Sequence, residues 1–263
     1  MRAAPVTAPQ PLVLVAHGSR DPRAAPVIEA LVRDVARLRP HAPVAAAFLD
    51  HAGPRVDRVL TGLASRGATG AVVVPLLLTS AYHHRVDLPA VLADARRHGP
   101  PMAVTLADTL GPLSRGVVAA PLVAALRHQL AVLGQRFDAV VLVAAGTAHA
   151  PSRTGIRRVA SALGEALRVP AVAAFASAAG PRPGVAVSRL RAAGARRVAV
   201  ASYFLAPGLL YDAAVDDARS AGAVAVAAPL GRTPHVPRLV LRRAAESAQS
   251  RWAELPRARA GAR

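Results

Sequence analysis

The chain has 263 residues, of which 53% are hydrophobic and 3% are aromatic, and its formal net charge is +18. This length favours two compact domains, and the absence of cysteine excludes disulfides, iron–sulfur clusters, thiolate metal sites and a cysteine nucleophile. The positive charge favours anionic partners, whereas the shortage of aromatic side chains that could stack on bases disfavours nucleic acid.

The N-terminal segment, MRAAPVTAPQ, lacks the long apolar stretch of a signal peptide. The longest apolar runs, such as AVVVPLLL, are too short to cross a bilayer. We therefore expect a cytoplasmic protein that binds neither membrane nor nucleic acid. Any metal that it binds must have nitrogen or oxygen ligands.

Apolar runs of strand length alternate with segments of helical period from the start of the chain. The first run, residues 11–16, precedes residues 24–38, in which apolar side chains recur every three or four positions as in an amphipathic helix. Further strands are predicted over 43–49, 70–78 and 102–107, and further helices over 54–66, 86–98 and 114–133.

The same order of elements then begins again. Strands are predicted over 137–146, 170–176, 196–206 and 223–228, and helices over 152–167, 184–193, 212–221 and 235–252. Continuous apolar strands that alternate with helices indicate parallel sheets covered on both faces. The sequence therefore predicts an α/β fold with two four-stranded parallel sheets.

Three matches between the halves, in the same order, indicate a tandem duplication. The segment LVLVAHGS (12–19) matches VVLVAAGT (140–147), the third strands match each other, and LADTLGP matches VAAPLGR further along. We expect an N-terminal α/β domain over residues 10–130 and a C-terminal repeat over residues 136–252. Residues 253–263 have no core pattern, and we expect a disordered tail there.

The duplication allows each strand end to be compared with its counterpart. His17 follows the first strand where the second half has Ala145, and His83 follows the third strand where the second half has Leu210. Asp50 ends the second strand in AFLDHAGP. Ligands gather at the carboxyl ends of parallel strands, and a His-His-carboxylate set with open positions suits Fe²⁺, Co²⁺ or Ni²⁺. The sequence thus predicts a metal site formed by His17, His83 and Asp50.

Three segments that contain these residues resemble a known protein family. LVLVAHGSRDP, AFLDHAGP and VVVPLLLTSAYHHRVDLP together resemble the class II chelatases of tetrapyrrole synthesis, and more narrowly the sirohydrochlorin chelatases of the CbiX/SirB type. The long members of that family are tandem duplications. The sequence departs from the family pattern at Asp50, where glutamate is common, and at Ala81, where glycine is common.

The resemblance implies a metal-inserting lyase that handles Co²⁺, Fe²⁺ or Ni²⁺ as a substrate and has no tightly bound cofactor. His17 and His83 would bind the metal and remove the pyrrole N–H protons, with Asp50 as an auxiliary ligand or orienting partner. The anionic tetrapyrrole would be bound by further residues, namely Ser19, Arg20, Tyr82, His84, Arg85 and Thr147. His84 is also an alternative to His83, and His149 is read as a solvated loop residue.

Other enzyme classes and a non-catalytic carrier are the alternatives to a chelatase. The sequence has no G-x-S-x-G elbow, no G-x-G-x-x-G after a strand and no G-x-x-x-x-G-K-[ST] loop, so hydrolase, dinucleotide and P-loop chemistry have no local signature. A non-catalytic carrier of a metal or an anionic tetrapyrrole stays open, as does a chelatase for another tetrapyrrole. We expect a monomer, with a dimer as the alternative.

Overall fold

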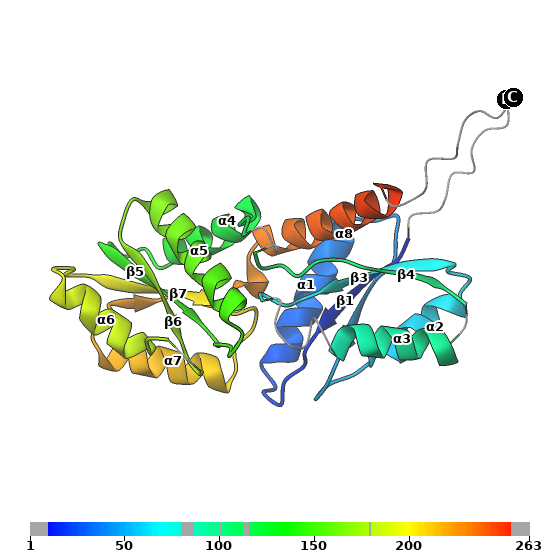
Figure 1. Cartoon of the computed structure of the whole chain (residues 1–263), viewed down its shortest axis with the longest axis horizontal. Coiled ribbons are helices and arrows are strands. Elements are labelled where there is room, and N and C mark those ends of the chain that lie inside the picture. The colour runs from blue at the N-terminus through cyan, green and yellow to red at the C-terminus, as the bar shows by residue number, and fades with distance from the viewer. Residues whose placement is uncertain (1–9, 80–86, 100, 113–115, 179, 254–263) are drawn as a thin grey trace, which may run out of the picture.

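The chain, seen as a computed structural model, has two lobes that each contain one parallel four-stranded sheet (Figure 1). The structure describes residues 10–79, 87–99, 101–112, 116–178 and 180–253. We call the sheet of strands β1 to β4, with the helices that cover it, the first lobe, and the sheet of strands β5 to β8, with its helices, the second lobe. The predicted fold class is confirmed.

The elements of the two sequence halves follow each other in matching order. The first half contains β1 (Leu12–Ala16), α1 (Ala24–Leu38), β2 (Val44–Phe48), α2 (Val56–Ala64), β3 (Gly70–Pro75), α3 (Leu88–His98), β4 (Ala103–Leu106) and α4 (Ala120–Val132). The second half contains β5 (Ala139–Ala144), α5 (Ala150–Leu167), β6 (Ala171–Phe175), α6 (Pro183–Ala192), β7 (Val198–Tyr203), α7 (Leu209–Ser220), β8 (Ala225–Val226), the 3₁₀ helix η2 (Leu230–Arg232) and α8 (His235–Ala253).

Strand order and register are the same in both sheets. The orders are β2-β1-β3-β4 and β6-β5-β7-β8, and every pairing is parallel. In the first sheet Leu12 pairs with Val44 and Val72, and in the second Val140 pairs with Ala171 and Ala199. The structural repeat therefore follows the sequence repeat strand by strand.

Two predicted elements are shorter in the structure at the ends that matter for the site. Strand β3 ends at Pro75 rather than at residue 78, because proline has no N–H to continue the ladder toward β4. The chain from Leu76 onward leaves the sheet. Helix α4 begins at Ala120 rather than at residue 114, since Gly116 has a left-handed φ of 73° that a helix cannot accommodate. Residues 113–115 lie outside the described residues.

The last helix of each half packs mainly on the lobe of the other half. Helix α8 contacts α1, β3 and β4 of the first lobe, and α4 contacts α5 and β7 of the second lobe. Figure 1 shows α8, in red, lying across the sheet of β1 to β4, and α4, in green, beside α5. The two exchanged helices also contact each other. The ranges 10–130 and 136–252 stay a prediction about the duplicated sequence units. The packing differs from these units, because α4 and α8 each pack on the lobe of the other half.

Apolar side chains form three buried clusters that follow from the alternation of side chains along each strand. Leu12 and Leu14 of β1 face α1 and α8 in a cluster that continues through α4 and α5 into the second lobe. Val13 and Val15 point to the opposite face, where α2 and α3 cover them. Helices α6 and α7 cover the corresponding face of the second sheet. One continuous core thus joins the lobes on the side away from α2, α3, α6 and α7.

Among the described residues, no helix has both the length and the apolar character needed to cross a membrane.

Candidate active site

A cleft of about 610 Å³ lies between the two lobes, where the carboxyl ends of both sheets face each other. Its first wall comes from the loops after β1, β2 and β3, and its second wall from the loops after β5 and β7. This volume is within the range of small-molecule sites, roughly 300–1,000 Å³. The position agrees with the rule that open parallel sheets bind ligands at their carboxyl ends.

His17 stands at the end of β1 and lines this cleft, as the sequence predicts for a strand-end residue. Its ring nitrogen Nδ1 lies 3.2 Å from the Gly18 carbonyl oxygen. Gly18 has a φ of 96°, and a Cβ at this position would lie 1.7 Å from the Asp50 carbonyl oxygen. Glycine therefore allows the loop after β1 to lie directly against the loop after β2, and the N–H of Asp50 donates to the His17 carbonyl at 2.8 Å.

The turn after β2 directs its two polar side chains differently. His51 lines the cleft, whereas Asp50 is not among the described residues that line it. The Asp50 side chain is 60% exposed and that of His51 is 31% exposed. The turn takes this form because His51 has a left-handed φ of 57°, which reverses the chain between the two residues.

The Asp50 carboxylate is bound to its neighbour rather than to the cleft. Its Oδ1 atom accepts a hydrogen bond of 2.8 Å from the His51 backbone N–H, and its Oδ2 atom lies 3.5 Å from His51 Nε2. The backbone hydrogen bond from His51 lowers the pKa of Asp50. Asp50 is therefore placed to orient the His51 ring, and its role as a metal ligand stays a prediction.

His51 was not singled out from the sequence, although a signal for it is present there. FLDHAGP at the end of β2 matches FASAAGP at the end of β6, which places His51 opposite Ala178. The structure bears out the equivalence, since Ala178 has a φ of 60°. The N–H of Phe48 donates to the Pro54 carbonyl at 2.9 Å, and the N–H of Phe175 donates to the Pro181 carbonyl at 3.0 Å. The two turns thus match at the left-handed residue and at this hydrogen bond, and they differ in the imidazole.

The remaining predicted residues have different positions. Ser19 and Arg20 line the cleft, and Arg20 and Asp21 are the lining residues with a charged side chain in the described part of the chain. Thr147 is not among the described lining residues, and its hydroxyl accepts a hydrogen bond of 3.1 Å from the His149 N–H. Four predicted residues lie outside the described residues, namely Tyr82, His83, His84 and Arg85.

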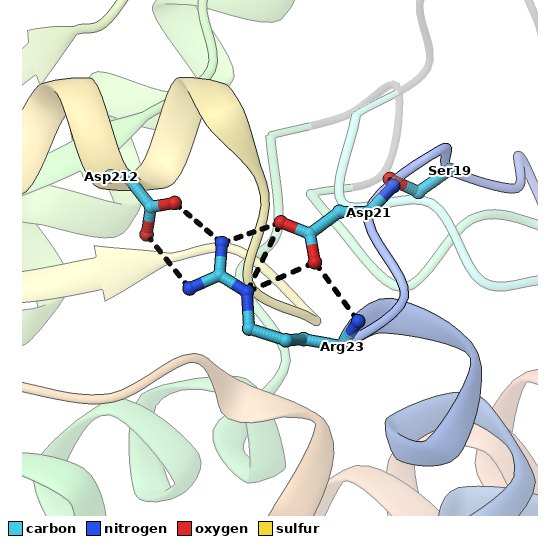
Figure 2. A network of polar contacts seen from close by, with 4 residues as sticks. All are labelled: Ser19, Asp21, Arg23 and Asp212. Carbon is cyan, nitrogen blue, oxygen red and sulfur yellow. Dashed lines mark hydrogen bonds and ion pairs between the residues drawn. The ribbon is translucent and has the colours of Figure 1, made fainter.

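Arg23 connects the two lobes beside the cleft. Figure 2 shows its guanidinium between Asp21, from the loop after β1, and Asp212, from α7. Its Nη2 atom lies 2.5 Å from Asp21 Oδ2 and 2.5 Å from Asp212 Oδ2. The hydrogen bonds from the Arg23 side chain and backbone hold the pKa of Asp21 at about 2, below its ordinary 3.8. The charge of Asp21 is thus balanced by Arg23, which leaves Arg20 as the lining cation for an anionic ligand.

The second lobe gives the cleft an apolar wall. The segment from the end of β7 into α7 lines it with Phe204, Leu205, Pro207, Leu209 and Leu210. Leu209 is 83% exposed and Leu210 is 46% exposed, which is high for large aliphatic side chains. Tyr203 is buried at the base of this wall, and its hydroxyl donates to the Leu78 carbonyl of the first lobe at 2.8 Å. An apolar wall opposite a histidine suits a ligand that has an extended apolar face.

A comparison with known protein families shows which family this chain belongs to. The CbiX family model matches residues 11–121 and 139–247, which covers both halves. This chain belongs to the CbiX family. The predicted resemblance is therefore confirmed.

CbiX-family relatives of this chain carry consistent names. The sirohydrochlorin ferrochelatase of Bacillus subtilis is 25% identical over 247 residues, 91% of this chain and 92% of the relative. The sirohydrochlorin cobaltochelatase of Priestia megaterium is 24% identical over 211 residues, 76% of this chain and 65% of the relative. Bacillus subtilis SirB with Fe³⁺ has a TM-score of 0.80 at 24% identity, covering 93% of this chain and 98% of that structure, which supports the shared fold.

His17 and His51 are the imidazoles that line the described part of the cleft. Among the described residues, no group of three or more histidine, aspartate or glutamate side chains is arranged to hold a metal ion. The His17 and His51 rings instead face the cleft as a pair, with centroids 6.1 Å apart and planes inclined by 47°. Neutral imidazoles in such a position can bind a divalent metal and accept protons.

Proposed function

We propose that this chain is a sirohydrochlorin chelatase, which inserts Co²⁺ or Fe²⁺ into sirohydrochlorin. The observation that carries the proposal is His17 at a strand end on the inter-lobe cleft, where the equivalent position of the second half is Ala145. The names of the CbiX-family relatives support the same reaction. The divalent metal is a substrate here, and the tetrapyrrole is the second substrate.

His17 supplies the chemistry that the reaction needs from the protein. Insertion requires two pyrrole N–H protons to leave as the metal exchanges its water ligands for ring nitrogens. A neutral imidazole at the cleft can accept such a proton, and general-base catalysis of this kind contributes on the order of 10²–10⁴-fold to a rate. We assign His17 and His83 to metal binding and proton removal. The Gly18 carbonyl beside His17 Nδ1 holds the ring in position.

The rest of the cleft suits an anionic macrocycle. The apolar wall of the second lobe, with Leu209 and Leu210 at its edge, can cover one face of a flat ring. Arg20 lines the same cleft and can pair with a peripheral carboxylate of sirohydrochlorin. Both walls come from one chain, so a monomer is sufficient for binding. We propose that it works in this form in the cytoplasm.

The test is anaerobic absorbance spectroscopy of sirohydrochlorin mixed with Co²⁺, Fe²⁺ or Ni²⁺. Each metal is followed with wild-type chain, with His17→Ala and without protein. We expect wild type to metallate many equivalents of sirohydrochlorin and His17→Ala to be slower by at least about 100-fold. The metal that gives the largest acceleration over the protein-free reaction indicates the preferred substrate.

His149→Ala is the matched control, because this histidine belongs to the second half and its Nδ1 atom contacts the Ser152 hydroxyl at 2.9 Å, outside the cleft lining. Its rate should equal that of wild type. Metallation by wild type no faster than the protein-free reaction would reject the proposal. Stoichiometric binding without turnover would then favour a carrier of the metal or of the tetrapyrrole.

A further inference from the structure

We infer that His51, rather than Asp50, binds the metal together with His17. The inference rests on the proposed function and deepens it, because it names the side chains of the described cleft that hold the metal before transfer. Asp50 instead orients the His51 ring, through the contact of its carboxylate with the Nε2 atom. His17 and His51 thus form the described part of the metal site, and His83 stays a further ligand under the proposed function.

The distance between the two rings is within the upper limit for one shared ion. An imidazole nitrogen binds a divalent metal at about 2.1 Å, so two rings on the same ion have centroids up to about 6.5 Å apart. The His17 and His51 centroids are 6.1 Å apart, with the planes tilted by 47°. Both residues line the same cleft. An ion between them would lie at the carboxyl end of β1, where the macrocycle can approach it from the cleft.

The contacts of Asp50 explain why the carboxylate acts indirectly. Its two oxygens contact the backbone N–H and the Nε2 atom of His51, and its side chain is 60% exposed to solvent. Contact at Nε2 leaves Nδ1 as the His51 nitrogen that can bind a metal. A carboxylate on the second nitrogen of a metal-binding histidine fixes the ring and increases its basicity, and losing it typically lowers metal affinity about 10–100-fold.

Imidazole ligands also suit an ion that has to leave again. Ligands on one side of an open cleft leave coordination positions for water and then for the pyrrole nitrogens, so transfer does not require a closed protein cage to open.

The second half shows that the imidazole is not needed to form the turn. Ala178 occupies the position of His51 with nearly the same left-handed φ, 60° against 57°. Alanine is therefore compatible with this backbone, and His51→Ala should fold. The fold therefore does not require the His51 imidazole, which can serve as a metal ligand.

The experiment measures Co²⁺ binding to the full chain by anaerobic isothermal titration calorimetry, without tetrapyrrole. We expect His51→Ala to weaken Co²⁺ binding by at least about 100-fold, and Asp50→Asn to weaken it by a smaller factor, about tenfold. His41→Ala is the matched control, since His41 is an exposed histidine between α1 and β2 and is not among the described cleft residues. Its affinity should equal that of wild type.

The outcomes separate this inference from the proposed function. Unchanged Co²⁺ affinity in His51→Ala, with sirohydrochlorin still metallated by wild type, would overturn the inference alone. A loss in Asp50→Asn as large as or larger than that in His51→Ala would make the carboxylate the ligand and would also overturn it, as would a wild-type chain that binds no Co²⁺. If Co²⁺ binding depends on His51 but wild type does not metallate sirohydrochlorin, the metal site stands and the proposed reaction falls.

Discussion

The two halves of the chain share a sheet topology and differ in the side chains that face the cleft. Gly18 and Gly146 have φ values of 96° and 99°, and each lets its loop lie against the turn after the neighbouring strand. In the first half these loops carry His17 and His51, whereas Ala145 and Ala178 take their places in the second. The glycines belong to the architecture of the repeat, and the histidines do not.

The comparison also distinguishes a polar side chain that stabilises a turn from one that positions a reactive group. In the second half the Ser177 hydroxyl donates to the Ala145 carbonyl at 2.7 Å, a contact that ties the two loops together. In the first half Asp50 occupies the equivalent position and contacts His51 instead. One half therefore uses its polar side chain for structure, and the other uses it to position an imidazole. The second half contributes to the cleft through apolar surface.

The largest expected effect on stability comes from breaking the helix exchange that joins the halves. Arg243 of α8 is 1% exposed, and it donates to the carbonyls of Thr109 at 2.7 Å and Gly111 at 2.9 Å in the first half. Arg243→Met would leave these acceptors without their donor. We expect the free energy of unfolding to fall by on the order of 3 kcal/mol, measured by urea denaturation.

The neighbouring Arg242 provides a matched control for that measurement. It contacts Glu246 at 2.7 Å, as Arg243 does at 2.8 Å, but its side chain is 44% exposed. Arg242→Met should therefore change the free energy of unfolding by less than about 1 kcal/mol. Equal effects of the two substitutions would mean that the buried contacts to the first half do not stabilise the exchanged helix.

The equivalent glycines allow the same substitution to be made in both halves. A Cβ on Gly18 would lie 1.7 Å from the Asp50 carbonyl oxygen, and one on Gly146 would lie 2.0 Å from that of Ser177. Gly18→Ala and Gly146→Ala should each lower the free energy of unfolding by roughly 2–4 kcal/mol, since both combine backbone strain with overlap. Only Gly18→Ala should also weaken Co²⁺ binding, because it displaces the turn that carries His51.

Thermal denaturation and Co²⁺ titration of both variants check this pair. Folded Gly146→Ala with weakened Co²⁺ binding would contradict the assignment of metal chemistry to the first half. Folded Gly18→Ala with wild-type affinity would show that the position of the Asp50–His51 turn does not matter for the ion.

The architecture could be predicted because it depends on local pattern. Continuous apolar runs such as residues 139–144 have one stable placement, inside a parallel sheet, and the alternation with helices fixes the order of elements. The exchange of α4 and α8 could not be predicted in this way. The apolar face of a helix shows that it covers a sheet, but it does not show which of two similar sheets it covers.

The sequence predicts the position of His17 at the cleft but not that of His51, which depends on backbone geometry. His17 follows β1 directly, so the end of the apolar run locates it at the cleft. The sequence predicts Asp50 of FLDHAGP as a metal ligand because carboxylates commonly bind divalent metals. The left-handed φ of His51, which turns the imidazole rather than the carboxylate to the cleft, has no signature in that residue alone. Comparison with Ala178 would have indicated it.

A smaller effect is expected for the hydrogen bond that joins the lobes at the base of the cleft. Tyr203 replaces Leu76 of the first half, and its buried hydroxyl donates to the Leu78 carbonyl at 2.8 Å. Burial raises the pKa of Tyr203, so the hydroxyl stays protonated as a donor at neutral pH. Tyr203→Phe should lower the free energy of unfolding by about 1 kcal/mol and leave Co²⁺ affinity unchanged. A changed affinity would show that this contact also positions the metal site.

The smallest effect concerns Arg23, which contacts one carboxylate from each half (Figure 2). Its hydrogen bonds lower the pKa of Asp21 from 3.8 to about 2. Because the folded-state pKa is the lower one, this interaction stabilises the fold fully above the ordinary pKa and is lost as the pH falls through about 2. Carbon-13 NMR titration of the carboxylates should show the pKa of Asp21 rising toward 3.8 in Arg23→Met, with Arg33→Met in α1, the helix that follows Arg23, as the control.

Asp212→Asn then tests which half holds the Arg23 side chain. Asp21 receives hydrogen bonds from both the backbone N–H and the guanidinium of Arg23, at 2.9 Å from the backbone, whereas Asp212 contacts the guanidinium alone. The local pair should therefore survive without its partner across the cleft, and the pKa of Asp21 should remain near 2 in Asp212→Asn. A rise comparable to that in Arg23→Met would mean that the second lobe positions Arg23, and that the two halves are coupled at the edge of the cleft as well as through their exchanged helices.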